Sequence, residues 1–160
     1  MKPWLKILNL AADSGPVEVL IYEQIGKDYW DQSGVGAKEF AEQFNAIPKT
    51  RDITLRIHSP GGSVWDGLAI YNIVLARRDK VTAHVDGVAF SAASFIAMAA
   101  KKVIMPKSAR MMIHDASGMA IGNSKDMREL ADLLDQESDN IANIYAEKTG
   151  KNFKEMRALM

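Results

Sequence analysis

The chain has 160 residues, of which 48% are apolar and 25% are charged, a composition typical of a globular domain with one sizeable core. Its 20 basic and 20 acidic side chains cancel, so it lacks the basic excess typical of nucleic-acid-binding proteins. It contains no cysteine, which excludes disulfides, thiolate zinc sites and cysteine nucleophiles.

The amino-terminal stretch MKPWLKILNLAADSG combines a short apolar run with charges. Lys6 interrupts this run and Asp13 follows it, so we interpret the stretch as mature protein and not as a secretory signal. The longest weakly polar run, which starts at Gly87, is too short to span a bilayer. We therefore expect a cytoplasmic protein with no membrane partner and, given its charge balance, no nucleic-acid partner.

The first two thirds of the chain alternate between two hydrophobic patterns. Alternating apolar and polar residues predict strands over residues 17–25, 53–57 and 81–85, with shorter strands over 102–105 and 110–113. Apolar residues at helical spacing predict helices over 37–47 and 65–78, and a polar loop before the first helix carries Tyr29 and Trp30. This alternation indicates an α/β fold with βαβ units around a largely parallel sheet.

The remainder of the chain is predicted to be helical. Ser124 can cap a long additional helix that ends before Thr149 and Gly150, and a short helix starts at Asn152. An apolar stripe along the long helix is formed by Met127, Leu130, Ala131, Leu134, Ser138, Ile141 and Tyr145. This stripe either packs on the chain's own sheet or forms an interface with another subunit.

The stretch 87–100, GVAFSAASFIAMAA, is where we expect the chemistry. We expect the chain to turn at Gly87 into a buried helix, which places Ser91 where a strand becomes a helix. The backbone N–H groups and the dipole at the start of a helix can stabilise an oxyanion on a bound carbonyl, so Ser91 is a candidate nucleophile. The alternative is structural: Ser91 caps the helix and Ser94 is a small packing residue.

Two further segments add to this candidate. The sequence SPGG at residues 59–62 either offers an N–H to a carbonyl and an edge to an extended peptide, or is an ordinary strand-to-helix turn. His114 follows the strand 110–113 and is either a general base or a structural histidine, the role we expect for His58 and His84. Because the three histidines lie on different elements without the carboxylate spacing of a metal site, we expect no metal.

Taken together and in this order, three segments resemble the Clp protease proteolytic subunit (ClpP) family, and most closely its phage-encoded relatives linked to head maturation. The segments are IHSPGGSVWDGLAIYNIV, VDGVAFSAASFIAMAA and VIMPKSARMMIH, which together cover about residues 53 to 114. The resemblance implies a single ClpP-like protease domain over residues 1–160 with a crotonase-type α/β fold and no cofactor.

The resemblance also implies roles for particular residues. In that family the serine of a G-x-A-x-S segment is the nucleophile, here Ser91, and the histidine after the M-I strand is the general base, here His114. Oxyanion donors are implied at Gly62 and Ala92. An extended peptide lying across the serine is expected to contact Gly61, Ser63, Val64, Asp115 and Ala116. We expect an apolar pocket beside Ser91.

The third member of the triad does not match the sequence in hand. In the family it is an aspartate beyond the short helix that follows the Thr-Gly turn, so we expect it beyond Met160 and interpret the chain as truncated at its carboxyl end. The chain's other candidate carboxylates do not match that position: Asp115, Asp126, Asp132, Asp135 and Asp139. Loss of the orienting acid in other triads lowers turnover by about ten-thousand-fold.

We therefore expect a serine endopeptidase that forms an acyl-enzyme on Ser91, in phage head maturation or in protein degradation. The resemblance implies a homo-oligomeric ring, sevenfold and stacked through the long helix, with an ATP-driven unfoldase as a partner. Apolar residues near the amino terminus favour assembly as well: Trp4, Leu5, Ile7, Leu8 and Leu10. The alternatives are a catalytically weak or inactive self-assembling scaffold subunit and a relative of the acyl-CoA hydratases and isomerases, which lack an obligatory Ser/His pair.

Overall fold

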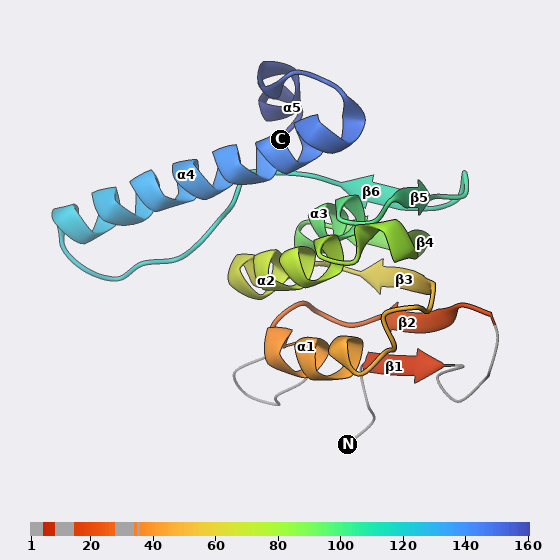
Figure 1. Cartoon of the computed structure of the whole chain (residues 1–160). Helices are drawn as coiled ribbons and strands as arrows, with labels where there is room; N and C mark the ends of the chain where they lie inside the picture. Colours follow the sequence, from red (N-terminus) through yellow and green to blue (C-terminus); the bar gives the residue numbers. More distant parts are fainter. Residues whose placement is uncertain (1–4, 9–14, 28–33, 35) are drawn as a thin grey trace. The chain divides into compact units, whose positions relative to one another are not determined.

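The computed structural model describes residues 5–8, 15–27, 34 and 36–160 (Figure 1). The chain divides into two compact units, Met1–Met112 and Ile113–Met160. Trp4, Leu10, Tyr29 and Trp30, which the sequence analysis named, lie outside the described residues.

The first unit is built on a six-stranded sheet of order β1-β2-β3-β4-β5, with β6 also paired to β4. The strands are β1 (Leu5–Leu8), β2 (Val17–Ile21), β3 (Ile53–Ser59), β4 (Val81–Phe90), β5 (Lys102–Ile104) and β6 (Arg110–Met112). Among the described strands only β1 pairs antiparallel, with β2, and the other pairs are parallel. The predicted α/β class is confirmed, whereas β1 was not predicted because its pattern of apolar residues has no clear alternation.

The core of the first unit follows directly from the alternation in its strands. Every second residue of β2, of β3 and of β4 as far as Val85 is buried, and the register aligns these residues in rows across the sheet, for example Val19 with Leu55 and Leu55 with Ala83. Along the chain, helices lie between the strands: α1 (Ala37–Asn45), α2 (Val64–Leu75), the short 3₁₀ helix η1 (Arg78–Lys80) and α3 (Ala92–Met98). Every residue of α3 is buried.

The prediction that the chain turns into a helix at Gly87 is wrong. The strand β4 continues through Gly87 to Phe90, because its last three residues pair with β6, a contact that local sequence does not reveal. The register between β3 and β4 shifts here: Ile57 faces Val85, and the next paired residues are Ser59 and Ala89. Gly87 allows the His58 side chain of β3 to lie close to the backbone of β4, since a Cβ added to Gly87 would lie 2.5 Å from Nδ1 of His58.

The predicted strand 17–25 also ends earlier than expected. β2 stops at Ile21, and Ile25 forms only an isolated parallel bridge with Gly62. This bridge brings a residue after β2 alongside the glycine loop that follows β3.

The second unit consists of a loop and the helices α4 (Ser124–Thr149) and α5 (Phe153–Leu159), with α5 lying beside the carboxyl-terminal part of α4 (Figure 1). The cap of α4 is Asn123 and not Ser124 as predicted, because the Asn123 side chain and Asp126 form a reciprocal capping box. Gly150, at φ 72°, ends α4 as predicted. No helix among the described residues is long and apolar enough to cross a membrane.

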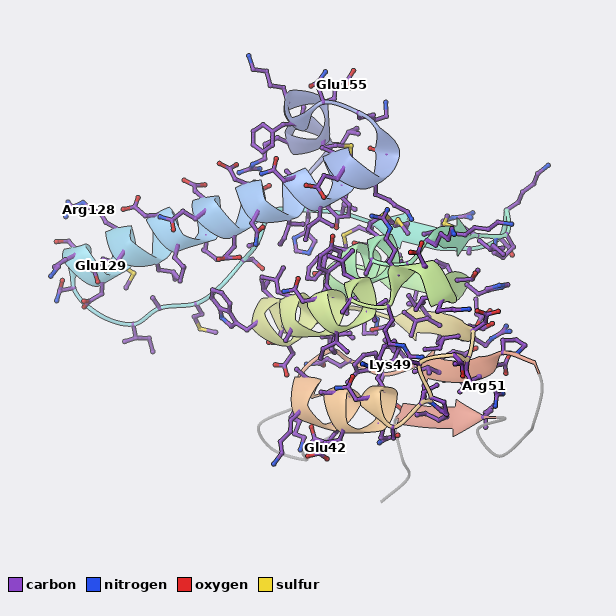
Figure 2. The ribbon with its side chains drawn as sticks, in the orientation of Figure 1. Glu42, Lys49, Arg51, Arg128, Glu129 and Glu155 are labelled. Carbon is purple, nitrogen blue, oxygen red and sulfur yellow. The ribbon has the colours of Figure 1, made fainter. Side chains whose placement is uncertain are left out.

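The two halves of α4 differ in burial. All of its buried residues lie in the carboxyl-terminal half: Ser138, Ile141, Ala142, Ile144 and Tyr145. The amino-terminal half has no buried residue, and Figure 2 shows Arg128 and Glu129 projecting from it. The predicted stripe therefore splits into a buried part and an exposed part.

Candidate active site

Ser91 lies at the sharp turn between β4 and α3. It occupies the N-cap position of α3 with φ 52° and ψ −124°, and it is the only non-glycine residue with positive φ among the described residues. Such a conformation costs about 1–3 kcal/mol and is found preferentially at functional sites. The Ser91 N–H donates to the carbonyl of Met112 at 2.9 Å, which fixes the turn against β6.

The structural alternative for Ser91 does not account for its side chain. Ser91 makes no side-chain capping hydrogen bond to α3, although it stands at the cap position. Ser94, by contrast, is fully buried and its hydroxyl donates to the carbonyl of Ser91. The predicted structural role therefore fits Ser94, and the placement of Ser91 at the start of the helix is confirmed.

The glycine loop after β3 packs directly on this turn. A Cβ added to Gly61 would lie 2.4 Å from the Phe90 carbonyl oxygen, 2.6 Å from the Ser91 Cβ and 3.0 Å from the Ala92 nitrogen. Gly61 also has φ 90°, in the region that favours glycine. Only glycine lets the loop approach the serine turn this closely.

The backbone of Gly62 is oriented by its bridge to Ile25. The Ile25 N–H donates to the Gly61 carbonyl at 2.8 Å, and the Ser63 N–H donates to the Ile25 carbonyl at 2.8 Å. In such a parallel bridge the N–H and C=O of the central residue, Gly62, point to the opposite edge. One edge of the loop is therefore occupied by Ile25, and the N–H of Gly62 lies on the other.

Ser59 is a residue that the sequence analysis missed. Its hydroxyl is fully buried, accepts from the Gly61 N–H at 3.1 Å and donates to the Glu23 carbonyl at 2.6 Å. The Ser59 side chain therefore anchors the glycine loop to the segment that follows β2. Its place at the end of a strand, just before Pro-Gly-Gly, is the sequence signal that could have indicated this role.

The neighbouring helices fix the remaining residues of the loop. Ser63 is the N-cap of α2 and its hydroxyl accepts from the Asp66 N–H at 3.2 Å, while Val64 is the first residue of that helix. A Cβ on Gly67 would lie 3.1 Å from the Ala92 Cβ, so α2 packs closely on the start of α3. The first unit thus brings together six of the predicted site residues, namely Gly61, Gly62, Ser63, Val64, Ser91 and Ala92.

The other three predicted site residues, His114, Asp115 and Ala116, belong to the second unit. His114 is half-buried and follows β6 by two residues along the chain. Asp115 forms an ion pair with Arg157 of α5, and the Ala116 N–H donates to the Ser138 hydroxyl at 2.9 Å. Both residues thus have partners within their own unit.

The first unit carries a polar cluster on the face of the sheet opposite its buried rows. Arg56 forms a bidentate pair with Asp86, at 2.9 Å and 2.5 Å, and the Tyr22 hydroxyl donates to Asp86 at 2.6 Å. Burial and the Asp86 carboxylate raise the pKa of Tyr22. The exposed His58 ring lies edge-on to Tyr22, with centroids 5.6 Å apart.

Two other features of the structure lie apart from Ser91. A pocket of about 730 Å³ lies where α1 and α2 end, and Ser91 is not among its lining residues, which include Lys49 and Arg77. Within the described part of the chain, no group of three or more His, Cys, Asp or Glu side chains is placed to hold a metal ion.

The fold is that of an α/β protein of the ClpP type, and in this chain a strained serine between a strand and a helix is backed by a glycine loop. Residues 36–160 match the sequence model of the Clp protease family. The chain belongs to the Clp protease family.

Relatives support this assignment. The chain is 33% identical to an ATP-dependent Clp protease proteolytic subunit of Oltmannsiellopsis viridis over 110 residues, which are 67% of this chain and 56% of that protein. It is 34% identical to ATP-dependent Clp protease proteolytic subunit 2 of Corynebacterium diphtheriae over 115 residues, 70% of this chain and 57% of that one. The chain thus spans little more than half the length of these relatives.

A solved structure shares the fold. A mutant ClpP1 from Listeria monocytogenes superposes with a TM-score of 0.73 at 23% identity, covering 88% of this chain and 77% of that chain. The predicted ClpP-type fold is therefore confirmed.

Proposed function

We propose that this protein is a serine endopeptidase whose nucleophile is Ser91 and whose general base is His114. The observation that carries the proposal is the strained Ser91 turn at the start of α3, packed against Gly61. The relatives of this chain are named as proteolytic subunits, which supports the same reaction class.

The reaction follows from the chemistry of these groups. The Ser91 hydroxyl attacks the carbonyl carbon of a peptide bond while His114 takes its proton, and the resulting oxyanion accepts hydrogen bonds from the N–H groups of Gly62 and Ala92. The C–N bond then breaks, and His114 gives the proton to the leaving amine. Water attacks the acyl-enzyme with His114 again as the base, which releases the acid and restores Ser91.

The proposed substrate is an extended polypeptide. It would pair with the edge of the glycine loop opposite Ile25, and the residues proposed to contact it are Gly61, Ser63, Val64, Asp115 and Ala116. Main-chain pairing carries little sequence information, so an apolar pocket beside Ser91 would set the selectivity. The orienting acid of the triad is proposed to lie beyond Met160.

We further propose that the two units form one ClpP-like domain of the crotonase type, which assembles into a cytoplasmic homo-oligomeric ring, sevenfold and stacked through α4. Exposed apolar side chains support assembly, among them Met127 and Leu133 on α4 and Met119 and Ile121 before it. The ring would work with an ATP-driven unfoldase, in phage head maturation or in protein degradation. Light scattering tests this proposal, and a stable monomer at micromolar concentration would contradict it.

The decisive experiment for the reaction is labelling with a fluorophosphonate, followed by mass spectrometry of the modified peptide. We expect modification of Ser91 and loss of both labelling and peptide cleavage in Ser91→Ala. Ser108→Ala is the matched control, because Ser108 is an exposed serine in the turn between β5 and β6, and it should label as the wild type does. Modification of Ser94 or Ser59 instead would overturn the assignment.

The same experiment separates the two alternatives. An assembled full-length protein that is not labelled favours the scaffold subunit. Turnover of an acyl-CoA substrate that survives Ser91→Ala favours a relative of the hydratases and isomerases, which need no serine nucleophile.

A further inference from the structure

Arg157, in α5, connects three carboxylates of the second unit. Its Nη1 pairs with Asp115, its Nε donates to Asp139 at 2.8 Å, and its Nη2 lies 4.0 Å from Asp135. Asp139 and Asp135 belong to α4, whereas Asp115 belongs to the loop that precedes it. The guanidinium thus ties the loop to both helices of its unit.

The loop residue that Arg157 contacts is the one directly after His114. The next residue along, Ala116, is held through its N–H by the hydroxyl of Ser138, which is buried and itself donates to the Leu134 carbonyl at 2.7 Å. Two consecutive residues after His114 are therefore fixed at separate points, one by α5 and one by α4. The backbone from which the His114 side chain extends is restrained on its carboxyl-terminal side.

We propose that Arg157 is a positioning residue for the general base, acting through Asp115. This inference rests on the proposed role of His114. A general base works only when it lies within hydrogen-bond reach of the nucleophile, and a displacement of about 1 Å can slow a reaction about a hundredfold. The fork of N–H donors on arginine engages several carboxylates at once, which the single ammonium of lysine does not reproduce.

The ion pairs themselves should add little to stability. Asp115, Asp139 and Asp135 have side chains that are 52%, 56% and 84% exposed, and exposed ion pairs are weak. A large kinetic effect of Arg157 with an unchanged unfolding transition would therefore report on position and not on folding.

The test measures the rate at which a fluorophosphonate modifies Ser91 in the full chain. We expect Arg157→Ala to slow this rate about ten- to a hundredfold, with Arg157→Lys in between. Lys154→Ala is the matched control, since Lys154 is an exposed cation on the same helix outside the ion pairs found among the described residues, and its rate should equal that of the wild type.

Two further variants separate positioning from simple attachment of α5. Asp115→Asn should slow labelling as Arg157→Ala does, and the double variant should be no slower than either single one, because both break the same contact. Asp139→Asn, which loosens α5 from α4 only, should have a smaller effect. Equal effects of Asp139→Asn and Asp115→Asn, or additive effects in the double variant, would overturn the proposal.

Failure of the proposed reaction is distinct from failure of this inference. If wild-type protein is not modified at Ser91, the proposed function is wrong. If the wild type is modified and Arg157→Ala reacts equally fast, the function stands and the role of Arg157 is wrong. Should Arg157→Ala not fold, Asp115→Asn carries the same test, because it removes only the contact to the loop.

Discussion

The first unit fixes the turn at Ser91 through backbone contacts, whereas the second unit fixes the segment after His114 through side chains. The serine turn is fixed by the N–H of Ser91 on Met112 and by the contact with Gly61, and Ser91 itself is strained. The segment after His114 is fixed by Arg157 and Ser138. The first arrangement depends on shape and the absence of side chains at glycine, and the second on charges and hydroxyls that single substitutions can remove.

The largest effect is expected from Gly61→Ala, which disturbs the backbone contact between the glycine loop and the Ser91 turn. The new methyl group would lie 2.4 Å from the Phe90 carbonyl oxygen, at a residue with φ 90°. Backbone must therefore shift, so we expect the free energy of unfolding to fall by more than about 2 kcal/mol and labelling of Ser91 to slow at least about a hundredfold. Urea unfolding and the fluorophosphonate assay measure both quantities.

Gly15→Ala is the matched control for this substitution. Gly15 has φ 85°, but a Cβ there would have no atom within 4 Å, so only the conformational cost of about 1 kcal/mol remains. Its labelling rate should equal that of the wild type. If Gly61→Ala behaved like Gly15→Ala, the close approach of the glycine loop to Ser91 would not matter for the site.

The difference between the two units also explains which structural features could be predicted from the sequence. The alternation of buried side chains in β2, β3 and β4, the glycine loop and Ser91 are local patterns, and each was predicted from a few adjacent residues. The continuation of β4 to Phe90 depends on pairing with β6, so it could not be predicted. The contact between Asp115 and Arg157 joins residues 42 positions apart and leaves no local pattern at all.

Two buried serines offer a matched comparison between the units. The Ser59 hydroxyl holds the Gly61 N–H, and the Ser138 hydroxyl holds the Ala116 N–H. Ser59→Ala leaves a buried N–H and the Glu23 carbonyl without their partner, so we expect a loss of about 1–3 kcal/mol in the free energy of unfolding. Ser138→Ala should cost less, because Ala116 is half-exposed and water can replace the hydroxyl. Urea unfolding of both variants measures the difference.

The rate of Ser91 labelling in Ser59→Ala extends this comparison to the proposed reaction. Ser59→Ala should slow labelling of Ser91, since the loop that carries the proposed oxyanion donor Gly62 loses its anchor. A Ser138→Ala variant that loses more stability than Ser59→Ala would mean that the serine hydroxyl in the second unit contributes more to folding than the one in the first unit.

The smallest effect concerns the polar cluster of the first unit formed by Tyr22, Arg56 and Asp86, in which charged side chains interact. The Tyr22 hydroxyl donates to Asp86 at 2.6 Å, and burial together with this carboxylate raises the pKa of Tyr22 above its ordinary value of 10. An unfolded tyrosine loses its proton near pH 10, before the folded one does. The stability that Tyr22 contributes is therefore complete below pH 10 and is lost as the pH rises through the folded pKa.

Tyr22→Phe removes this titration. Between pH 8 and pH 11 we expect the free energy of unfolding of the wild type to fall further than that of the variant, by about 1 kcal/mol or less because Tyr22 is 40% exposed. All other titrating groups are common to both proteins and cancel in the difference, which urea unfolding at the two pH values measures. Labelling of Ser91 at pH 8 should be unchanged, because the turn is fixed by Met112 and Gly61 and not by this cluster. A variant that labels tenfold more slowly would show that the turn at Ser91, too, depends on distant side chains, and the contrast between the two units would then fail.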